Sequence, residues 1–94
     1  MEKYLVIIEK AESNYAAFSP DVLGCIATGK TVEEVTQEIK DALLFHIESM
    51  LESGEEIPQP RGLTYHIEQG IFNENEIAEH YYITEVEVPV PQHA

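Results

Sequence analysis

Three short apolar segments fall within the first thirty residues, and polar, proline or glycine residues bound each of them. Residues 3–9 (KYLVIIE) carry a continuous apolar run, which is typical of a central strand buried on both faces. Residues 14–19 (NYAAFS) and 24–29 (GCIATG) are shorter, and the turn-forming pair Pro20-Asp21 follows the first of them. Strands this close together, joined by short turns, predict an antiparallel meander.

From residue 31 onward the apolar positions recur with the period of a helix. Thr31 followed by Glu34 forms a capping box, which predicts a helix start. Gly54, with Pro58 beyond it, predicts the helix end, so the expected helix spans residues 32–53. One stripe of this helix should pack on the sheet, and it consists of Val32, Val35, Ile39, Ala42, Leu43, His46, Ile47 and Met50.

The last third of the chain has a less regular pattern. Residues 63–68 (LTYHIE) alternate and predict a strand, whereas residues 73–81 predict one or two helical turns. Residues 82–88 alternate clearly, with Thr84, Val86 and Val88 on one face, and predict a half-buried strand. The predicted fold class is α+β: a three-stranded antiparallel meander, one long helix packed on the sheet, and a closing C-terminal strand.

Three stretches of this sequence together resemble the N-terminal domain of the HicB antitoxin family. They are residues 15–25 (YAAFSPDVLGC), 28–34 (TGKTVEE) and 52–58 (ESGEEIP). They match a strand–turn–strand pattern Y-x-A-x-x-P-D-L-P-G-C, a T-x-E-E helix start and a G-x-x-I-P helix exit. The resemblance implies a β-β-β-α-β fold similar to part of ribonuclease H. It also implies a partner, the HicA toxin, which is a small basic mRNA endonuclease.

The resemblance also suggests how the chain is organised, and where it departs from the family. We expect a single HicB-like domain over residues 1–94, with a core at 1–60, an insertion at 61–80, a closing strand at 81–90 and a tail at 91–94. Val22 and Leu23 stand where the family has Leu-Pro, which should change only the stiffness of the turn. Many family members continue into a helix-turn-helix or ribbon-helix-helix domain. The resemblance does not extend to such a domain, so operator binding is not expected of this chain.

Charge is the outlying feature of the composition. The 94 residues include 5 Lys and Arg but 18 Asp and Glu, which gives a net charge of −13. Such a chain repels phosphate backbones, so direct nucleic-acid binding is not expected. The longest apolar run, residues 4–8, is far shorter than the roughly 18 residues of a membrane helix. No signal peptide is recognisable, and we therefore expect a cytoplasmic protein.

The residue types that carry chemistry do not assemble into a site in the sequence. Asp21 and Cys25 share a turn, but no base for a nucleophile accompanies them, so Cys25 is interpreted as a small core residue. A single cysteine excludes an internal disulfide and a zinc site of several thiolates. The four histidines lack the spacing of metal ligands, and the abundant carboxylates do not converge as a two-metal hydrolase requires. We expect no cofactor, no metal and no enzymatic activity.

The outer face of the predicted helix is acidic and contains one aromatic residue. The face is either a solvated surface or a surface that steers a basic partner toward the domain. Phe45 lies among its carboxylates, where it is either a binding hot spot or is covered by residues 61–80. The acidic residues are Glu33, Glu34, Glu38, Asp41, Glu48 and Glu52.

The predicted function is that of an antitoxin-like module that neutralises a HicA-type ribonuclease toxin by covering its active site. A homodimer or higher homo-oligomer is expected through pairing of strand edges. The alternative is a structural domain that oligomerises and has no toxin partner. The residues predicted to contact the partner are Tyr15, Phe18, Asp21, Glu34, Glu38, Asp41, Phe45 and Glu48.

Overall fold

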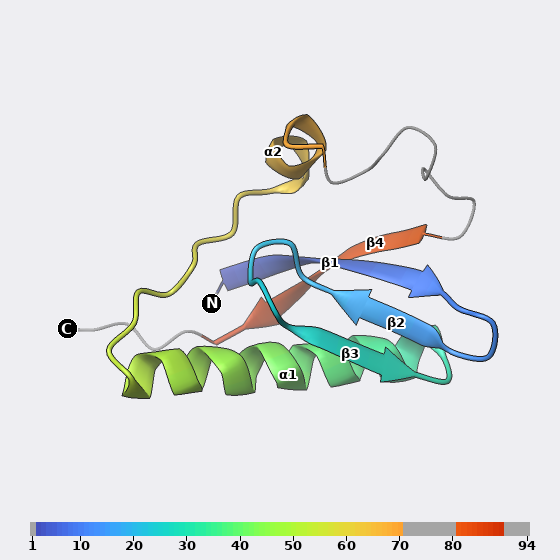
Figure 1. The fold of residues 1–94 in the computed structure, drawn as a ribbon, viewed down its shortest axis with the longest axis horizontal. Helices are drawn as coiled ribbons and strands as arrows, with labels where there is room; N and C mark the ends of the chain where they lie inside the picture. The colour runs from blue at the N-terminus through green and yellow to red at the C-terminus, as the bar shows by residue number, and fades with distance from the viewer. Residues whose placement is uncertain (1, 71–80, 90–94) are drawn as a thin grey trace.

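A four-stranded antiparallel sheet with one long helix forms the body of the domain (Figure 1). The computed structural model describes residues 2–70 and 81–89. The strands lie in the order β3-β2-β1-β4, and each neighbouring pair is antiparallel. The predicted α+β class is confirmed. The elements in chain order are β1 (Glu2–Lys10), β2 (Tyr15–Phe18), β3 (Ile26–Gly29), α1 (Val32–Glu52), α2 (Leu63–Glu68) and β4 (Tyr81–Val88).

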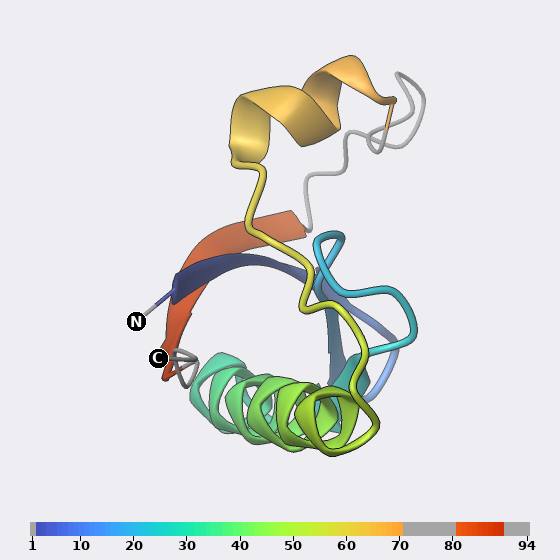
Figure 2. The same ribbon diagram turned by 90° about the vertical axis from the view of Figure 1, so that its left-hand side faces the viewer.

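Strand β1 is central, as its unbroken apolar sequence predicts. It pairs with β2 on one side and with β4 on the other, and residues 4–8 are all buried. Tyr4, Val6 and Ile8 belong to the core that packs against α1. Leu5 and Ile7 point to the opposite face, because successive side chains of a strand alternate. That face is the side on which α2 lies (Figure 2).

Helix α1 begins and ends where the sequence predicts. The Glu34 amide donates to Thr31 Oγ1 at 3.0 Å, and the Lys30 amide donates to Glu34 Oε2 at 2.7 Å. At the other end Gly54 adopts a φ of 74°, the left-handed conformation that favours glycine after a helix. The buried side chains are Val35, Ile39, Leu43 and Ile47, which lie on the predicted stripe.

A close approach to β3 fixes the first turns of α1. A Cβ atom at Gly29 would lie 2.7 Å from the backbone nitrogen of Val35, so only glycine fits without a shift of the backbone. This contact packs the edge strand of the sheet directly against the helix.

The prediction of a strand at residues 63–68 is wrong, because these residues form helix α2. Their alternation placed Leu63, Tyr65 and Ile67 on one face, but all three are exposed, and His66 is the buried residue of the six. A buried contact between His66 and Asp21 holds the segment over one face of the sheet. The predicted helical turns at residues 73–81 fall largely on residues 71–80, which lie outside the described residues.

Candidate protein-binding surface

One side of α1 presents the predicted acidic face to solvent. Glu34, Glu38, Asp41 and Glu48 are all exposed, as are the flanking Glu33 and Glu52. Phe45 lies on the same helix and is 72% exposed. Of the segment 61–80, the described residues 61–70 do not cover Phe45, because α2 lies on the other side of the sheet (Figure 2). Residues 71–80 lie outside the described residues.

The carboxylates of this face differ in their local partners. Glu34 caps the helix start, and Asp41 Oδ1 accepts a hydrogen bond from Gln37 Nε2 at 2.9 Å. Within the described ranges the ion pair is Lys3 with Glu87, and His66 is hydrogen-bonded to Asp21, so neither contact involves α1. The face thus keeps its negative charge, although like-charge pairs one turn apart cost about 0.2–0.5 kcal/mol each.

Asp21 does not share the exposed surface of the predicted contact residues on α1, because its side chain is buried. Its side chain has no exposed area, because three groups surround the carboxylate. Oδ2 accepts the Leu5 amide at 3.0 Å, and Oδ1 accepts the Arg61 amide at 3.0 Å. His66 Nε2 donates to the same Oδ1 at 2.7 Å. The carboxylate ties β1, the segment before α2 and α2 itself to the β2–β3 connection.

This role of His66 was not predicted from the sequence. Nothing in the spacing of Asp21 and His66, which are 45 residues apart, marks them as a pair. The one available signal is that a histidine stands among apolar residues in a short segment.

Tyr15 and Phe18 lie on opposite faces of the sheet. Tyr15 packs against the core beside α1, and its ring lies 6.4 Å from that of Tyr82. Phe18 is paired with Ile7 in the β1–β2 register and faces the side of α2. Of the eight predicted contact residues, the structure thus brings together the five on α1 and places Tyr15, Phe18 and Asp21 elsewhere.

Cys25 is a core residue, as expected. It is 5% exposed, and burial raises the pKa of its thiol above the ordinary value of 9.0. A protonated, buried thiol is a poor nucleophile. Asp21 is fully occupied by its three donors, so the two residues of this turn form no catalytic pair.

The described part of the chain offers no other obvious chemistry. Among residues 2–70 and 81–89, no group of three or more His, Cys, Asp or Glu side chains is placed to hold a metal ion. Over the same residues, no helix has the length and apolar character needed to cross a membrane.

Comparison with protein families decides what kind of domain this is. Residues 4–88 match the model of the HicB-like antitoxins of bacterial toxin–antitoxin systems. The chain belongs to this family. A protein of Haemophilus phage HP1, an uncharacterized 14.9 kDa protein from the rep-hol intergenic region, is 41% identical over 66 residues. That match takes in 70% of this chain and 50% of the phage protein, so the chain spans half the length of this relative.

Solved HicB structures share the fold. The antitoxin HicB of Burkholderia pseudomallei superposes with a TM-score of 0.74 at 19% identity, over 100% of this chain and 71% of that one. A chain of a toxin–antitoxin complex from Streptococcus pneumoniae superposes with a TM-score of 0.71 at 18% identity, over 93% of this chain and 68% of that one. The fold predicted for this HicB-like domain is therefore confirmed.

Proposed function

We propose that this HicB-like antitoxin neutralises a small basic ribonuclease toxin of the HicA type by binding over its active site. The acidic outer face of α1, with Phe45 exposed among its carboxylates, is the observation that carries the proposal. A toxin that grips RNA phosphates has to be basic, and opposite charge raises association rates by roughly 10–10³-fold. The chain itself acts by binding and performs no catalysis, and it acts in the cytoplasm, where the toxin meets mRNA.

The proposed contact surface centres on the exposed α1 residues Glu34, Glu38, Asp41, Phe45 and Glu48. An exposed aromatic ringed by charged groups has the composition of a binding hot spot with a polar rim. Tyr15 and Phe18 are half-buried and contribute only where they reach the surface. A toxin–antitoxin complex among the structures of the same fold supports a partner of this kind.

Co-expression with a small basic ribonuclease toxin of the HicA type tests the proposal. We expect the two proteins to co-purify at low salt, and the association rate to fall as salt screens their charges. The double variant Glu38→Gln/Glu48→Gln should associate more slowly and lose part of the salt dependence, while its melting temperature is retained. If the two folded proteins do not associate at low salt, the domain acts without a toxin and the proposal is wrong.

A further inference from the structure

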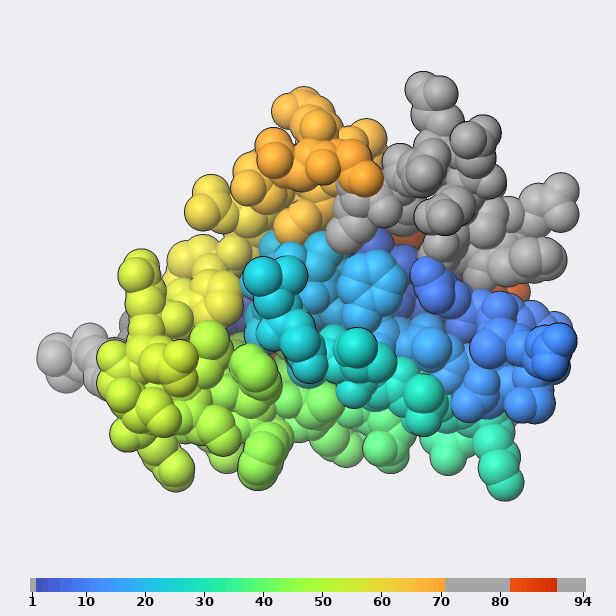
Figure 3. All heavy atoms as spheres, in the orientation of Figure 1, coloured from blue at the N-terminus to red at the C-terminus, as the bar shows by residue number. Residues whose placement is uncertain are grey.

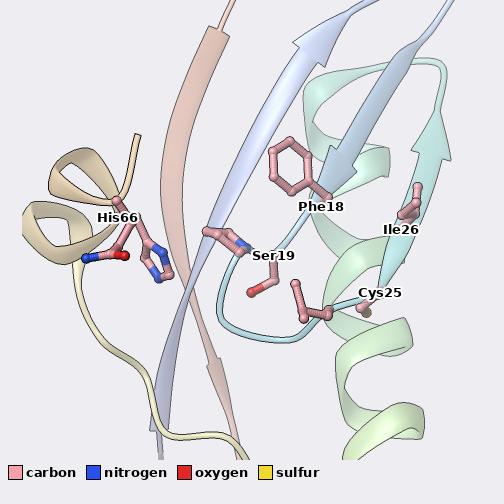
Figure 4. Close-up of a pocket in the computed structure, with 9 residues that line it drawn as sticks. Phe18, Ser19, Cys25, Ile26 and His66 are labelled. Carbon is pink, nitrogen blue, oxygen red and sulfur yellow. The ribbon is translucent and has the colours of Figure 1, made fainter. Parts of the chain in front are cut away.

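A cavity of about 390 Å³ opens between α2 and the β2–β3 connection, away from the acidic face of α1 (Figure 4). Phe18, Leu23 and Ile26 form its apolar wall, and Ser19, His66 and Gln69 supply its polar groups. Leu23 is 86% exposed and Ile26 is 68% exposed, so both present apolar surface to solvent. A cavity of this size lies within the roughly 300–1,000 Å³ of sites that bind a ligand or a partner's side chain.

The lining of the cavity differs in charge from the rest of the molecule. Asp, Glu, Lys and Arg make up 24% of the chain, yet none of the nine residues that line the cavity is one of these. Protein interfaces have this anatomy, because charged residues are depleted from the buried centre and retained at the rim.

The hydroxyl of Ser19 gives the cavity an unused hydrogen-bonding group. Ser19 is 2% exposed, and its Oγ atom has no hydrogen-bond partner among the described residues. Ser19 lies between His66 on one side and Cys25 and Ile26 on the other (Figure 4). A buried hydroxyl without a partner is costly, so an occupant that bonds to it gains more than apolar contact alone.

The wall formed by α2 depends on one contact. His66 is the buried residue of this helix, and its bond to Asp21 anchors the helix beside the β2–β3 connection. The buried carboxylate therefore sets the position of one wall of the cavity relative to the other.

We infer that this cavity receives one large side chain of the basic toxin, with an apolar body and a hydrogen-bonding end such as tyrosine has. The inference rests on the proposed function, and it adds the site on this chain whose contact slows dissociation of the complex. Figure 3 shows α1, β3 with the β2–β3 connection, and α2 on one face of the molecule, so a single partner can contact all of them. The acidic face attracts the toxin, and the cavity slows its release.

Charge favours the toxin over a second copy of this chain as the occupant. Two copies would each bring a net charge of −13, and the uncharged cavity offers nothing to offset their repulsion. The same negative charge attracts a basic partner.

Dissociation kinetics test the inference. The probe is a basic ribonuclease toxin of the HicA type, with its nuclease activity removed by substitution. Leu23→Ser and Ile26→Ser should each raise the dissociation rate about 30-fold and leave the association rate nearly unchanged. Ser19→Ala should raise it about 5-fold without lowering the melting temperature, since the variant removes an unpaired hydroxyl. Ile83→Ser is the matched control for Ile26→Ser, because Ile83 is 45% exposed on β4 and does not line the cavity.

The possible outcomes separate this inference from the proposed function. Absence of any complex with the unaltered chain overturns both. A complex whose dissociation rate is the same for the unaltered chain, Leu23→Ser and Ile26→Ser overturns the cavity assignment alone. Loss of self-association in these two variants, with toxin release unchanged, would identify a second copy as the occupant and also overturn it. Melting temperatures within about 2 °C of the unaltered chain confirm that the variants are folded.

Discussion

Asp21 illustrates how one residue can look like surface in the sequence and act as the centre of a buried network. A Pro-Asp pair in a turn is ordinarily exposed, and the sequence analysis placed Asp21 on the contact surface. In the structure its carboxylate accepts hydrogen bonds from Leu5, Arg61 and His66. A buried carboxylate is tolerated only when such donors satisfy it.

Removal of the Asp21 carboxylate should therefore be costly. Asp21→Ala leaves three donors without an acceptor, and we expect a loss of about 3 kcal/mol or more in the free energy of unfolding. His66→Ala removes one donor and leaves the other two bonds in place, so its loss should be clearly smaller. Urea denaturation of both variants measures the difference. Equal losses for the two substitutions would show that the carboxylate does not join these segments.

Burial of Cys25 and Tyr4 makes the stability depend on alkaline pH. Burial raises the pKa of the Cys25 thiol above 9.0, and burial with nearby carboxylates raises that of the Tyr4 phenol above 10.0. Both groups bind their protons more tightly in the folded state. Their contribution is complete below pH 9, and it is lost as the pH rises through 9 and then 10.

Denaturation at a series of pH values tests this dependence. The free energy of unfolding should fall above pH 9, and Cys25→Ala should delay the fall toward the range in which Tyr4 titrates. A free energy that stays constant to pH 11 would contradict the burial of both groups.

At the scale of elements, the sequence predicted those helices and strands whose ends are marked by local sequence signals. Helix α1 was predicted to within one residue because Thr31, Glu34 and Gly54 mark its ends, and a helical period fills it. Strand β1 followed from its unbroken apolar run. Helix α2 was missed, because six residues are too few to distinguish a period of 2 from one of 3.6, and the contact that holds it joins residues distant in sequence. The cavity was missed for the same reason, since tertiary packing alone brings its walls together.

Truncation of a side chain to alanine should have different effects on the two faces of α1: weaker toxin binding on the exposed face and lower stability on the buried face. Phe45→Ala removes an exposed ring, so the melting temperature should stay unchanged while the toxin is bound about 30-fold more weakly. Leu43→Ala on the buried face should cost about 2–5 kcal/mol of stability. Calorimetry and a binding titration separate the two effects. If Phe45→Ala changes neither stability nor binding, Phe45 is an ordinary exposed side chain.

At the scale of the whole molecule, the sheet has two edges that another strand could extend. They are β3 and β4, and the sequence predicts a homodimer through strand pairing. Light scattering should give a mass of about twice 10.6 kDa at high micromolar concentration. Added salt should favour the dimer, because it screens the repulsion between two acidic chains. A mass of 10.6 kDa under all these conditions would show that the edges remain unpaired.

The overall architecture divides the proposed binding task between two surfaces. Helix α1 lies on one side of the sheet and α2 on the other (Figure 2), and β3 with the β2–β3 connection lies between them on one face of the molecule (Figure 3). A partner bound across this face would contact both the carboxylates of α1 and the uncharged cavity.

Neutralisation of the toxin by this chain can be measured directly in an RNA-cleavage assay. A toxin of the HicA type is held at a fixed concentration, and this chain is titrated against it. If the chain neutralises the toxin, cleavage should fall to background once the antitoxin reaches the toxin's concentration. Phe45→Ala and Leu23→Ser should shift the titration to higher antitoxin concentrations. Undiminished cleavage by a toxin shown to be fully bound would contradict the account, because the domain would then bind without covering the active site.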